Sequence, residues 1–410
     1  ERGAERTLLY TVYYIYFFCG LTQCFEGVFL PEFKQQFHLS YQQQMYTMFA
    51  KNIPSLLALV IGLFVARVGY KNCITLAMCF YGSGTLLLVP GLDTSRYGLV
   101  LLGFFLIGTG FSLQIVSGNP LLCALGLPQR SASRLNLGNA LGAVAQIAAP
   151  ATLSLIIPAS VVLVQQKVPY MKVLFVILAS VLFATAIGTA LIGNVEVQSR
   201  LGASESTLAG AGRRGFLVNP RLMFGFLAIF LVLGVESGLF ALYRNYLEDP
   251  AIAGLSAHAS ERLFTLYFAL FALGRLAGSW VQRKIRPAVH LLISLAGAGV
   301  CLLVVLFASN SLAVAGVTVI GFFVSIFYPT LYAMAIEGLG ERTGQASGLL
   351  TTAFLGCAII PVLQGRIADA FSLRYSYALG IGAYVFAAAY AVSVARSERS
   401  KMTASAAVSG

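Results

Sequence analysis

Four ionisable side chains lie well inside long apolar stretches of the sequence: Glu26, Lys51, Glu236 and Arg275. A charged side chain at the centre of a membrane-spanning helix costs about 3 kcal/mol or more unless it is paired or hydrated, so such residues are candidates for function. A carboxyl group in this setting can take up and release a proton, and a neighbouring cation can hold the carboxylate or an anionic solute. We therefore predict that Glu26 and Glu236 are proton-coupling residues.

Glu26 and Lys51 are expected at similar depths in two consecutive helices. Glu26 lies about seven residues from the outer end of the first apolar block, and Lys51 lies about nine from the outer start of the second, which at 1.5 Å per residue differ by a few ångström. An ion pair between them is feasible. It is either a static bridge that holds the helical hairpin together or a switch in which protonation of Glu26 releases Lys51.

Amide and aromatic side chains recur at helical spacing in three of the apolar blocks, which places them on common helix faces. Amides offer paired donors and acceptors to a polyhydroxy solute, and aromatic rings can stack on its apolar face. The same stripes could instead supply hydrogen bonds between helices. The predicted substrate-binding residues are Tyr16, Gln23, Glu26, Lys51, Gln114, Asn119, Asn136, Asn139, Gln146, Glu236, Tyr328 and Tyr332.

The composition predicts helices that cross a membrane. Apolar residues make up 58% of the 410 residues and charged residues 10%, whereas soluble proteins carry about 25% charge. A spanning helix needs roughly 20 mostly apolar residues. Twelve such blocks are predicted, so the fold class is an all-α membrane protein. They cover residues 8–33, 42–66, 73–91, 97–124, 134–157, 170–193, 221–247, 260–282, 288–308, 311–337, 344–365 and 374–395.

Lysine and arginine residues predict the orientation. Most of the 27 fall in the segments that are cytoplasmic if both termini are cytoplasmic. The net charge of +12 therefore reflects the membrane topology. The sequence contains no basic soluble domain of the kind that would indicate nucleic-acid binding. We expect a multi-pass protein of the plasma membrane, which is the inner membrane if the source is bacterial.

Motifs for covalent chemistry are missing from the sequence. The seven cysteines and three histidines form no CxxC or Cys/His cluster, so no metal site is indicated. The sequence contains no P-loop and no nucleophile elbow. The chain is therefore predicted to be no enzyme and to need no cofactor, and any transport is driven by an ion gradient. The coupling ion is expected to be the proton, with sodium as the alternative.

The chain is predicted to contain two similar halves. Residues 194–220 are polar and rich in Ser and Gly, as in a linker. Three local matches recur in order at an offset close to half the chain: Gly62 to Arg67 with Gly278 to Arg283, Pro120 with Pro329, and Pro150 with Pro361. The predicted parts are an N-terminal six-helix half (1–193), a cytoplasmic linker (194–220), a C-terminal six-helix half (221–395) and a cytoplasmic tail (396–410).

Basic residues near the cytoplasmic helix ends are candidates for gating. Arg67 and Lys71 follow the second block, and Arg283 follows the eighth. Arg134 opens the fifth block and Arg275 lies about two turns inside the eighth. We predict that these five residues help to open and close the cytoplasmic side.

Two six-helix halves with basic turns after the second and eighth helices resemble the major facilitator superfamily, whose members are built from such repeats. Ala66 and Gln282 stand where an acid is usual in its signature. A narrower resemblance is to the fucose/glucose/galactose–proton symporter family. The residues that carry it are Leu30-Pro31-Glu32-Phe33, Gly118-Asn119-Pro120, Arg134-Leu135-Asn136-Leu137, Gly274-Arg275 and Tyr328-Pro329-Thr330.

This resemblance implies import of a sugar coupled to protons, with acidic residues in the first and fourth helices. The sequence departs from that pattern at three places. Glu26 precedes the expected acidic position, which holds Gly27, and Gln114 is the nearest polar residue in the fourth helix. Gly142 occupies the place of an asparagine expected in the fifth helix.

We therefore expect a monomeric secondary transporter with a midplane site that each side reaches in turn. The favoured function is proton-coupled symport of a small polar solute, a sugar by resemblance. One alternative is a proton-coupled antiporter that exports a cationic or amphipathic compound, and another is a carrier of a carboxylated solute, given Lys51 and Arg244. A receptor or channel is the alternative without active transport.

Overall fold

The computed structural model describes residues 2–125, 131–158, 161, 163–192, 219–282, 284–337 and 343–409. Within these ranges the regular structure is helical and contains no strand. The prediction of an all-α membrane protein is confirmed. The chain divides into two compact units, Glu1–Ala211 with Ala257–Thr265, and Gly212–Ser256 with Leu266–Gly410.

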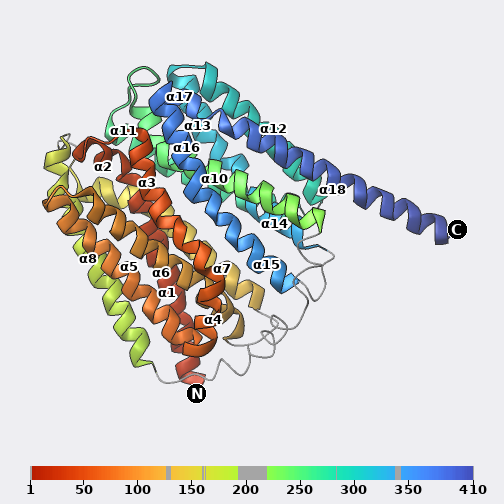
Figure 1. Cartoon of the computed structure of the whole chain (residues 1–410), viewed down its shortest axis with the longest axis horizontal. Helices are drawn as coiled ribbons and strands as arrows, with labels where there is room; N and C mark the ends of the chain where they lie inside the picture. The colour runs from red at the N-terminus through yellow and green to blue at the C-terminus, as the bar shows by residue number, and fades with distance from the viewer. Residues whose placement is uncertain are drawn as a thin grey trace. The chain divides into compact units, whose positions relative to one another are not determined.

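The N-terminal unit contains eight α-helices between Arg2 and Leu191 in the described residues (Figure 1, red to yellow-green). Ser40 begins one of them with a capping box, in which Ser40 and Gln43 each bond the other's backbone N–H. The helices are α1 (Arg2–Val28), α2 (Leu30–Gln36), α3 (Tyr41–Asn52), α4 (Ala58–Val68), α5 (Tyr70–Asp93), α6 (Tyr97–Ala124), α7 (Ser131–Ile156) and α8 (Val164–Leu191).

The second predicted block is interrupted in its middle. α3 and α4 are separated by the 3₁₀ turn η1 (Ile53–Leu57). Pro54 stands in the first turn of η1 and has no N–H to continue the ladder of α3. Gly69, at a φ of 91°, ends α4 and turns the chain into α5, a backbone conformation that favours glycine.

The C-terminal unit contains the helices from α10 to α18, except for the first residues of α11, which belong to the other unit. Asn219 caps α10 by accepting from two backbone N–H groups. The elements are α10 (Pro220–Glu248), α11 (Ala257–Val281), α12 (Pro287–Phe307), α13 (Asn310–Val324), α14 (Phe327–Ile336), α15 (Thr343–Thr352), η4 (Ala353–Leu355), α16 (Gly356–Ala370), α17 (Leu373–Ser376) and α18 (Leu379–Ser409).

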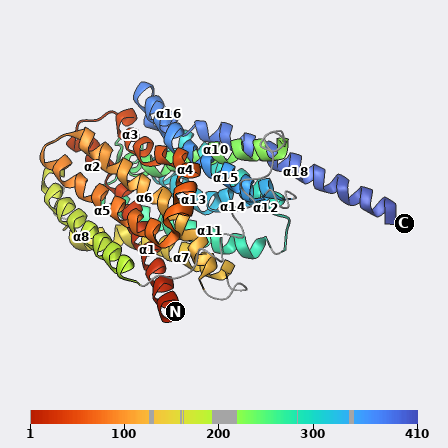
Figure 2. The same cartoon turned by 60° about the horizontal axis from the view of Figure 1, so that its bottom comes forward.

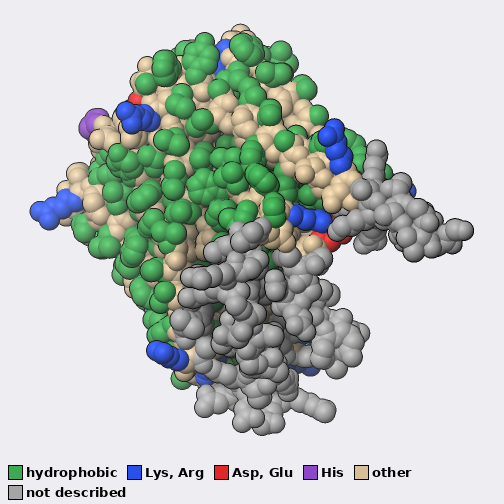
Figure 3. All heavy atoms as spheres, turned by 45° about the vertical axis from the view of Figure 1, so that its right-hand side comes forward, with side chains coloured by type: hydrophobic (Ala, Val, Ile, Leu, Met, Phe, Trp, Pro, Cys, Tyr) green, Lys and Arg blue, Asp and Glu red, His purple; other side chains and the backbone are tan. Residues whose placement is uncertain are grey.

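Helices occupy each of the twelve predicted apolar segments. Ten helical segments in the described residues are long and apolar enough to cross a membrane. Five predicted blocks are each divided within their length: 8–33 between α1 and α2, 42–66 at η1, 311–337 between α13 and α14, 344–365 at η4, and 374–395 between α17 and α18. The helix of the last block extends beyond 395, because α18 continues to Ser409. Hydrophobic side chains cover most of the described surface that is visible in Figure 3, as expected for helices facing lipid.

Glycines allow a close helix crossing in each unit. α1 packs along α7 (Figures 1 and 2) and α10 packs along α16. A Cβ atom at Gly20 would lie 2.4 Å from the carbonyl oxygen of Gly142, and one at Gly356 would lie 2.0 Å from that of Phe230. The crossing of α1 with α7 in the N-terminal unit, which are the first and fifth predicted blocks, is thus repeated in the C-terminal unit by α10 with α16, the seventh and eleventh blocks.

A cysteine thiol bonds a backbone carbonyl at each of these crossings. Cys24 of α1 donates to the carbonyl of Gln146 at 3.2 Å, and Cys357 of α16 donates to that of Leu233 at 3.5 Å. The two units therefore share both the close approach and the polar contact beside it.

Candidate functional site

Tyr16 and Asn119 are brought together in the N-terminal unit. The Tyr16 hydroxyl of α1 donates to Oδ1 of Asn119 in α6 at 2.5 Å. The Tyr16 ring fills the space over two glycines, because Cβ atoms at Gly118 and Gly138 would lie 3.2 and 3.5 Å from it. The tyrosine is buried, so it connects α1 with α6 and α7.

A second polar chain crosses three helices of the same unit. Nε2 of Gln23 in α1 donates to the Tyr81 hydroxyl in α5 at 3.3 Å, and that hydroxyl donates to Oε1 of Gln114 in α6 at 3.3 Å. Tyr81 is fully buried. It is absent from the predicted site residues, because a lone tyrosine in the third apolar block carries no polar stripe.

Lys51 is buried on α3, directly against α6. A Cβ atom at Gly108 of α6 would lie 1.7 Å from the carbonyl oxygen of Lys51, so α3 passes very close to α6 there. The side chains of Glu26 and Asn136 lie outside the described residues, and the Glu26–Lys51 pair stays a prediction. On α7, Asn139 is exposed and Gln146 is half-buried.

In the C-terminal unit, Arg275 bonds the backbone at a helix break and interacts electrostatically with Glu236. Nε of Arg275 in α11 donates to the carbonyl of Ser325 at 3.2 Å, in the interruption between α13 and α14. Its guanidinium lies 4.7 Å from the ring centroid of Phe271. The charges of Arg275 and the half-buried Glu236 act on each other. Arg275 was predicted as a gating residue, and its contacts group it with the predicted proton site.

Aromatic rings pack together on the two helices that carry these charges, α10 and α11, and on α14. Tyr328 and Tyr332 of α14 have ring centroids 5.8 Å apart, and Tyr328 contacts Phe354 at 5.5 Å, at the η4 interruption. Tyr267 of α11 contacts Tyr243 at 5.3 Å. Polar and aromatic groups thus meet at two of the interrupted segments, those between α13 and α14 and at η4.

Several predicted gating residues make contacts within one unit. Nζ of Lys71 donates to the carbonyl of Ile192 at 2.6 Å, and Nε of buried Arg134 donates to the carbonyl of Leu122 at 2.9 Å. Arg67 is exposed, and Arg283 lies outside the described residues. Gln282, where an acid is usual, donates to the Thr330 hydroxyl at 2.8 Å. Their role in gating stays a prediction.

The sequence of the chain matches a known superfamily along most of its length. The sequence profile of the major facilitator superfamily matches residues 12–354 and 246–409, so the chain belongs to that superfamily. It is a multi-pass membrane transporter, and the prediction of a transporter rather than an enzyme is confirmed.

Particular relatives narrow the comparison. The chain is 28% identical to a glucose/galactose transporter of Brucella abortus over 379 residues, covering 92% of this chain and 91% of the relative. It is 24% identical to the L-fucose-proton symporter of Escherichia coli K12 over 392 residues, covering 87% and 85%. These relatives bear out the narrower resemblance to the fucose/glucose/galactose–proton symporters.

Solved structures share the fold. The crystal structure of FucP in the outward conformation matches with a TM-score of 0.65 at 22% identity, covering 94% of this chain and 98% of the other. The nucleoside transporter NupG matches with a TM-score of 0.70 at 12% identity, covering 96% and 98%. At these identities the similarity concerns the fold alone.

Proposed function

We propose that this protein is a proton-coupled symporter that imports a small polar solute, a sugar, by alternating access. The observation that carries the proposal is the hydrogen-bonded chain Gln23–Tyr81–Gln114 across α1, α5 and α6. Amides joined through a hydroxyl offer both donors and acceptors among apolar helices, which suits a neutral polyhydroxy solute. The relatives named as glucose/galactose and L-fucose transporters support a sugar.

Glu236 is the proposed proton site of the C-terminal unit, and Glu26 that of the N-terminal unit. Glu236 makes no hydrogen bond to another described side chain and lies beside the Arg275 cation. A carboxyl group there can be neutral in one state of the cycle and held by Arg275 in another. The relative named as a proton symporter favours the proton over sodium as coupling ion.

The two alternative substrate classes differ in their support. The aromatic cluster Tyr328, Tyr332 and Phe354 would suit a cationic or amphipathic compound, since aromatic faces attract cations. A carboxylated solute needs an available cation. Arg244 is 2% exposed and its Nη2 lies 2.8 Å from Glu248, so its charge is already compensated.

For the cellular setting, we propose the plasma membrane, the inner membrane in a bacterium, with both termini cytoplasmic and the monomer as working unit. Two observations support this: the excess of Lys and Arg in the segments predicted to be cytoplasmic, and relatives from bacteria.

Flux into proteoliposomes under an imposed pH gradient tests the proposal. Labelled glucose, galactose and fucose are offered to the wild type and to Glu236→Gln and Glu26→Gln. We expect the wild type to accumulate at least one hexose and each variant to retain exchange but lose accumulation. Asp93→Asn, an exposed acid paired with Lys172, is the matched control and should accumulate normally.

Two results would contradict the proposal. Gradient-driven efflux of a cationic dye without hexose flux would support the antiporter instead. Undiminished accumulation in both Gln variants would show that the carboxylates have no part in coupling.

Tyr81→Phe is expected to raise the KM for the transported hexose about fivefold to tenfold with little change in kcat. The substitution removes the hydroxyl shared by Gln23 and Gln114, and a hydrogen bond contributes about 1 kcal/mol. Uptake kinetics at saturating proton gradient measure the change. Tyr97→Phe, which removes a hydroxyl bonded to the Gln43 carbonyl near the outer ends of α3 and α6, should leave KM unchanged. Equal KM values for the two variants would show that the chain Gln23–Tyr81–Gln114 takes no part in substrate binding.

A further inference from the structure

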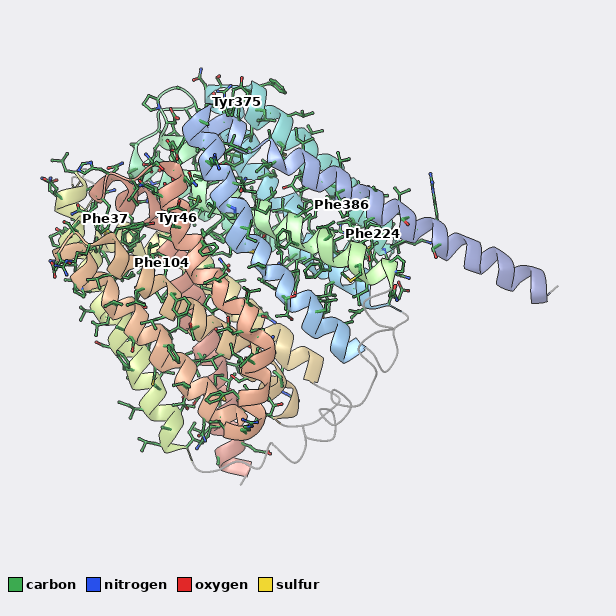
Figure 4. The ribbon with its side chains drawn as sticks, in the orientation of Figure 1. Phe37, Tyr46, Phe104, Phe224, Tyr375 and Phe386 are labelled. Carbon is green, nitrogen blue, oxygen red and sulfur yellow. The ribbon has the colours of Figure 1, made fainter. Side chains whose placement is uncertain are left out.

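The register of α18 against α10 is set by three contacts. A Cβ atom at Gly225 of α10 would lie 2.9 Å from the Tyr390 hydroxyl, and one at Gly380 of α18 would lie 3.2 Å from Val235. The rings of Phe224 and Phe386 lie 6.4 Å apart, next to the first of these points along α10 (Figure 4). The two helices therefore run antiparallel, with the start of α18 at the level of Val235.

Tyr384 lies one turn after Gly380, so it falls on the same side of α18. Its side chain is 4% exposed, and its buried hydroxyl has no hydrogen-bond partner. The hydroxyls of Tyr243 and Tyr246, by contrast, bond to Thr318 at 2.7 Å and to the Val305 carbonyl at 2.6 Å. A buried hydroxyl without a partner is unusual and calls for a physical reason.

Side chains on a helix tilt toward its N-terminus. Because α10 and α18 are antiparallel, the side chains of Glu236 and Tyr384 tilt toward each other along the helix axes. The Tyr384 ring contacts the ring of Phe327 at 5.3 Å, at the first residue of α14. Phe327 follows directly on the interruption whose Ser325 carbonyl accepts from Arg275.

Glu236 interacts electrostatically with groups on two other helices, α11 and α18. Arg275 and Tyr267 approach from α11, and Tyr384 approaches from α18. Tyr328 of α14 acts on Arg275. On α16, the thiol of Cys357 bonds to the Leu233 carbonyl. Tyr384 thus differs from the other groups in combining a buried, unpartnered donor with proximity to Glu236.

We propose that Tyr384 is a positioning residue for the proton site, and that its hydroxyl donates to the Glu236 carboxylate after the proton has left. In that state Arg275 compensates the charge and Tyr384 supplies a hydrogen bond from the α18 side. When Glu236 takes up its proton from water, the neutral carboxyl no longer needs this donor. The Tyr384 hydroxyl then has no hydrogen-bond partner, as in the structure. Tyr384 keeps its own proton throughout. The inference rests on the proposed role of Glu236.

The test is the pH dependence of hexose exchange and accumulation in proteoliposomes by Tyr384→Phe, which keeps the ring on Phe327. A hydroxyl that stabilises the charged carboxylate makes proton release easier, so its removal should shift the midpoint of the pH profile to more alkaline pH, by about one unit. Tyr390→Phe is the matched control. It removes a buried hydroxyl of the same helix beside Gly225, which lies about 16 Å along α10 from Glu236, and its profile should match the wild type.

The outcomes separate this inference from the proposed function. If Glu236→Gln abolishes the pH dependence and Tyr384→Phe leaves the midpoint unchanged, the positioning role is wrong and the proton site stands. If Glu236→Gln keeps the wild-type pH dependence, the proton site itself is wrong. In a Glu236→Gln background, Tyr384→Phe should change nothing further, and an added shift there would overturn the inference.

Discussion

Lys167→Met is expected to lower the free energy of unfolding of the N-terminal unit by about 3–5 kcal/mol. Nζ of Lys167 in α8 lies 3.0 Å from Oε1 of Glu32 in α2, with the two side chains 6% and 4% exposed. Removing the cation takes the charge of Lys167 away from a carboxylate that is buried from water. Thermal unfolding of the purified protein in detergent measures the loss.

Two further variants identify burial as the cause. Glu32→Gln combined with Lys167→Met should recover most of the lost stability, because a buried pair contributes little net free energy over neutral side chains. Lys172→Met breaks the pair with Asp93, in which the side chains of Lys172 and Asp93 are 31% and 50% exposed. This substitution should lower the free energy of unfolding by at most about 1 kcal/mol. Equal losses for Lys167→Met and Lys172→Met would contradict the explanation.

Gly356→Ala is expected to cost about 3 kcal/mol or more and to remove most of the folded protein. The added Cβ would lie 2.0 Å from the Phe230 carbonyl oxygen. That oxygen belongs to the backbone of α10, so relief requires separating α10 from α16. The yield of monodisperse protein after size-exclusion chromatography measures the effect.

A matched glycine tests whether the crossing is responsible. A Cβ atom at Gly382 of α18 meets no atom within 4 Å, so Gly382→Ala should change stability by no more than about 1 kcal/mol. Gly20→Ala at the corresponding crossing of α1 and α7 should behave like Gly356→Ala. Normal yield of Gly356→Ala would show that the two helices can separate at little cost.

The helices could be predicted because apolar length and breakers define them locally. The interruptions were not predicted. Pro54 is a local signal for η1, but the break between α13 and α14 contains neither proline nor glycine at Ser325 and Ile326. There the carbonyl of Ser325 accepts from Arg275, a residue fifty positions earlier, and single-sequence periodicity carries no record of that contact.

Helical spacing selected Tyr16 and Gln23, and the family resemblance pointed to Gln114 and Asn119. The structure joins these four residues into two hydrogen-bonded groups. Their role in binding stays a prediction. Spacing missed the hydroxyls of Tyr81 and Tyr384, because each stands alone in an apolar helix. A tyrosine facing lipid and one facing a carboxylate look identical in sequence, and only the rotation of the helix in its bundle distinguishes them.

The thiol hydrogen bonds at the two glycine crossings affect the design of labelling experiments. Spectroscopic distance measurements on transporters commonly start from a background without native cysteines. Replacing Cys24 or Cys357 by alanine removes the donor to the carbonyl of Gln146 or Leu233, where α1 meets α7 and α10 meets α16. Serine keeps a donor at the same position and is the replacement of choice at these two sites, whereas alanine is expected to suffice at the half-buried Cys79.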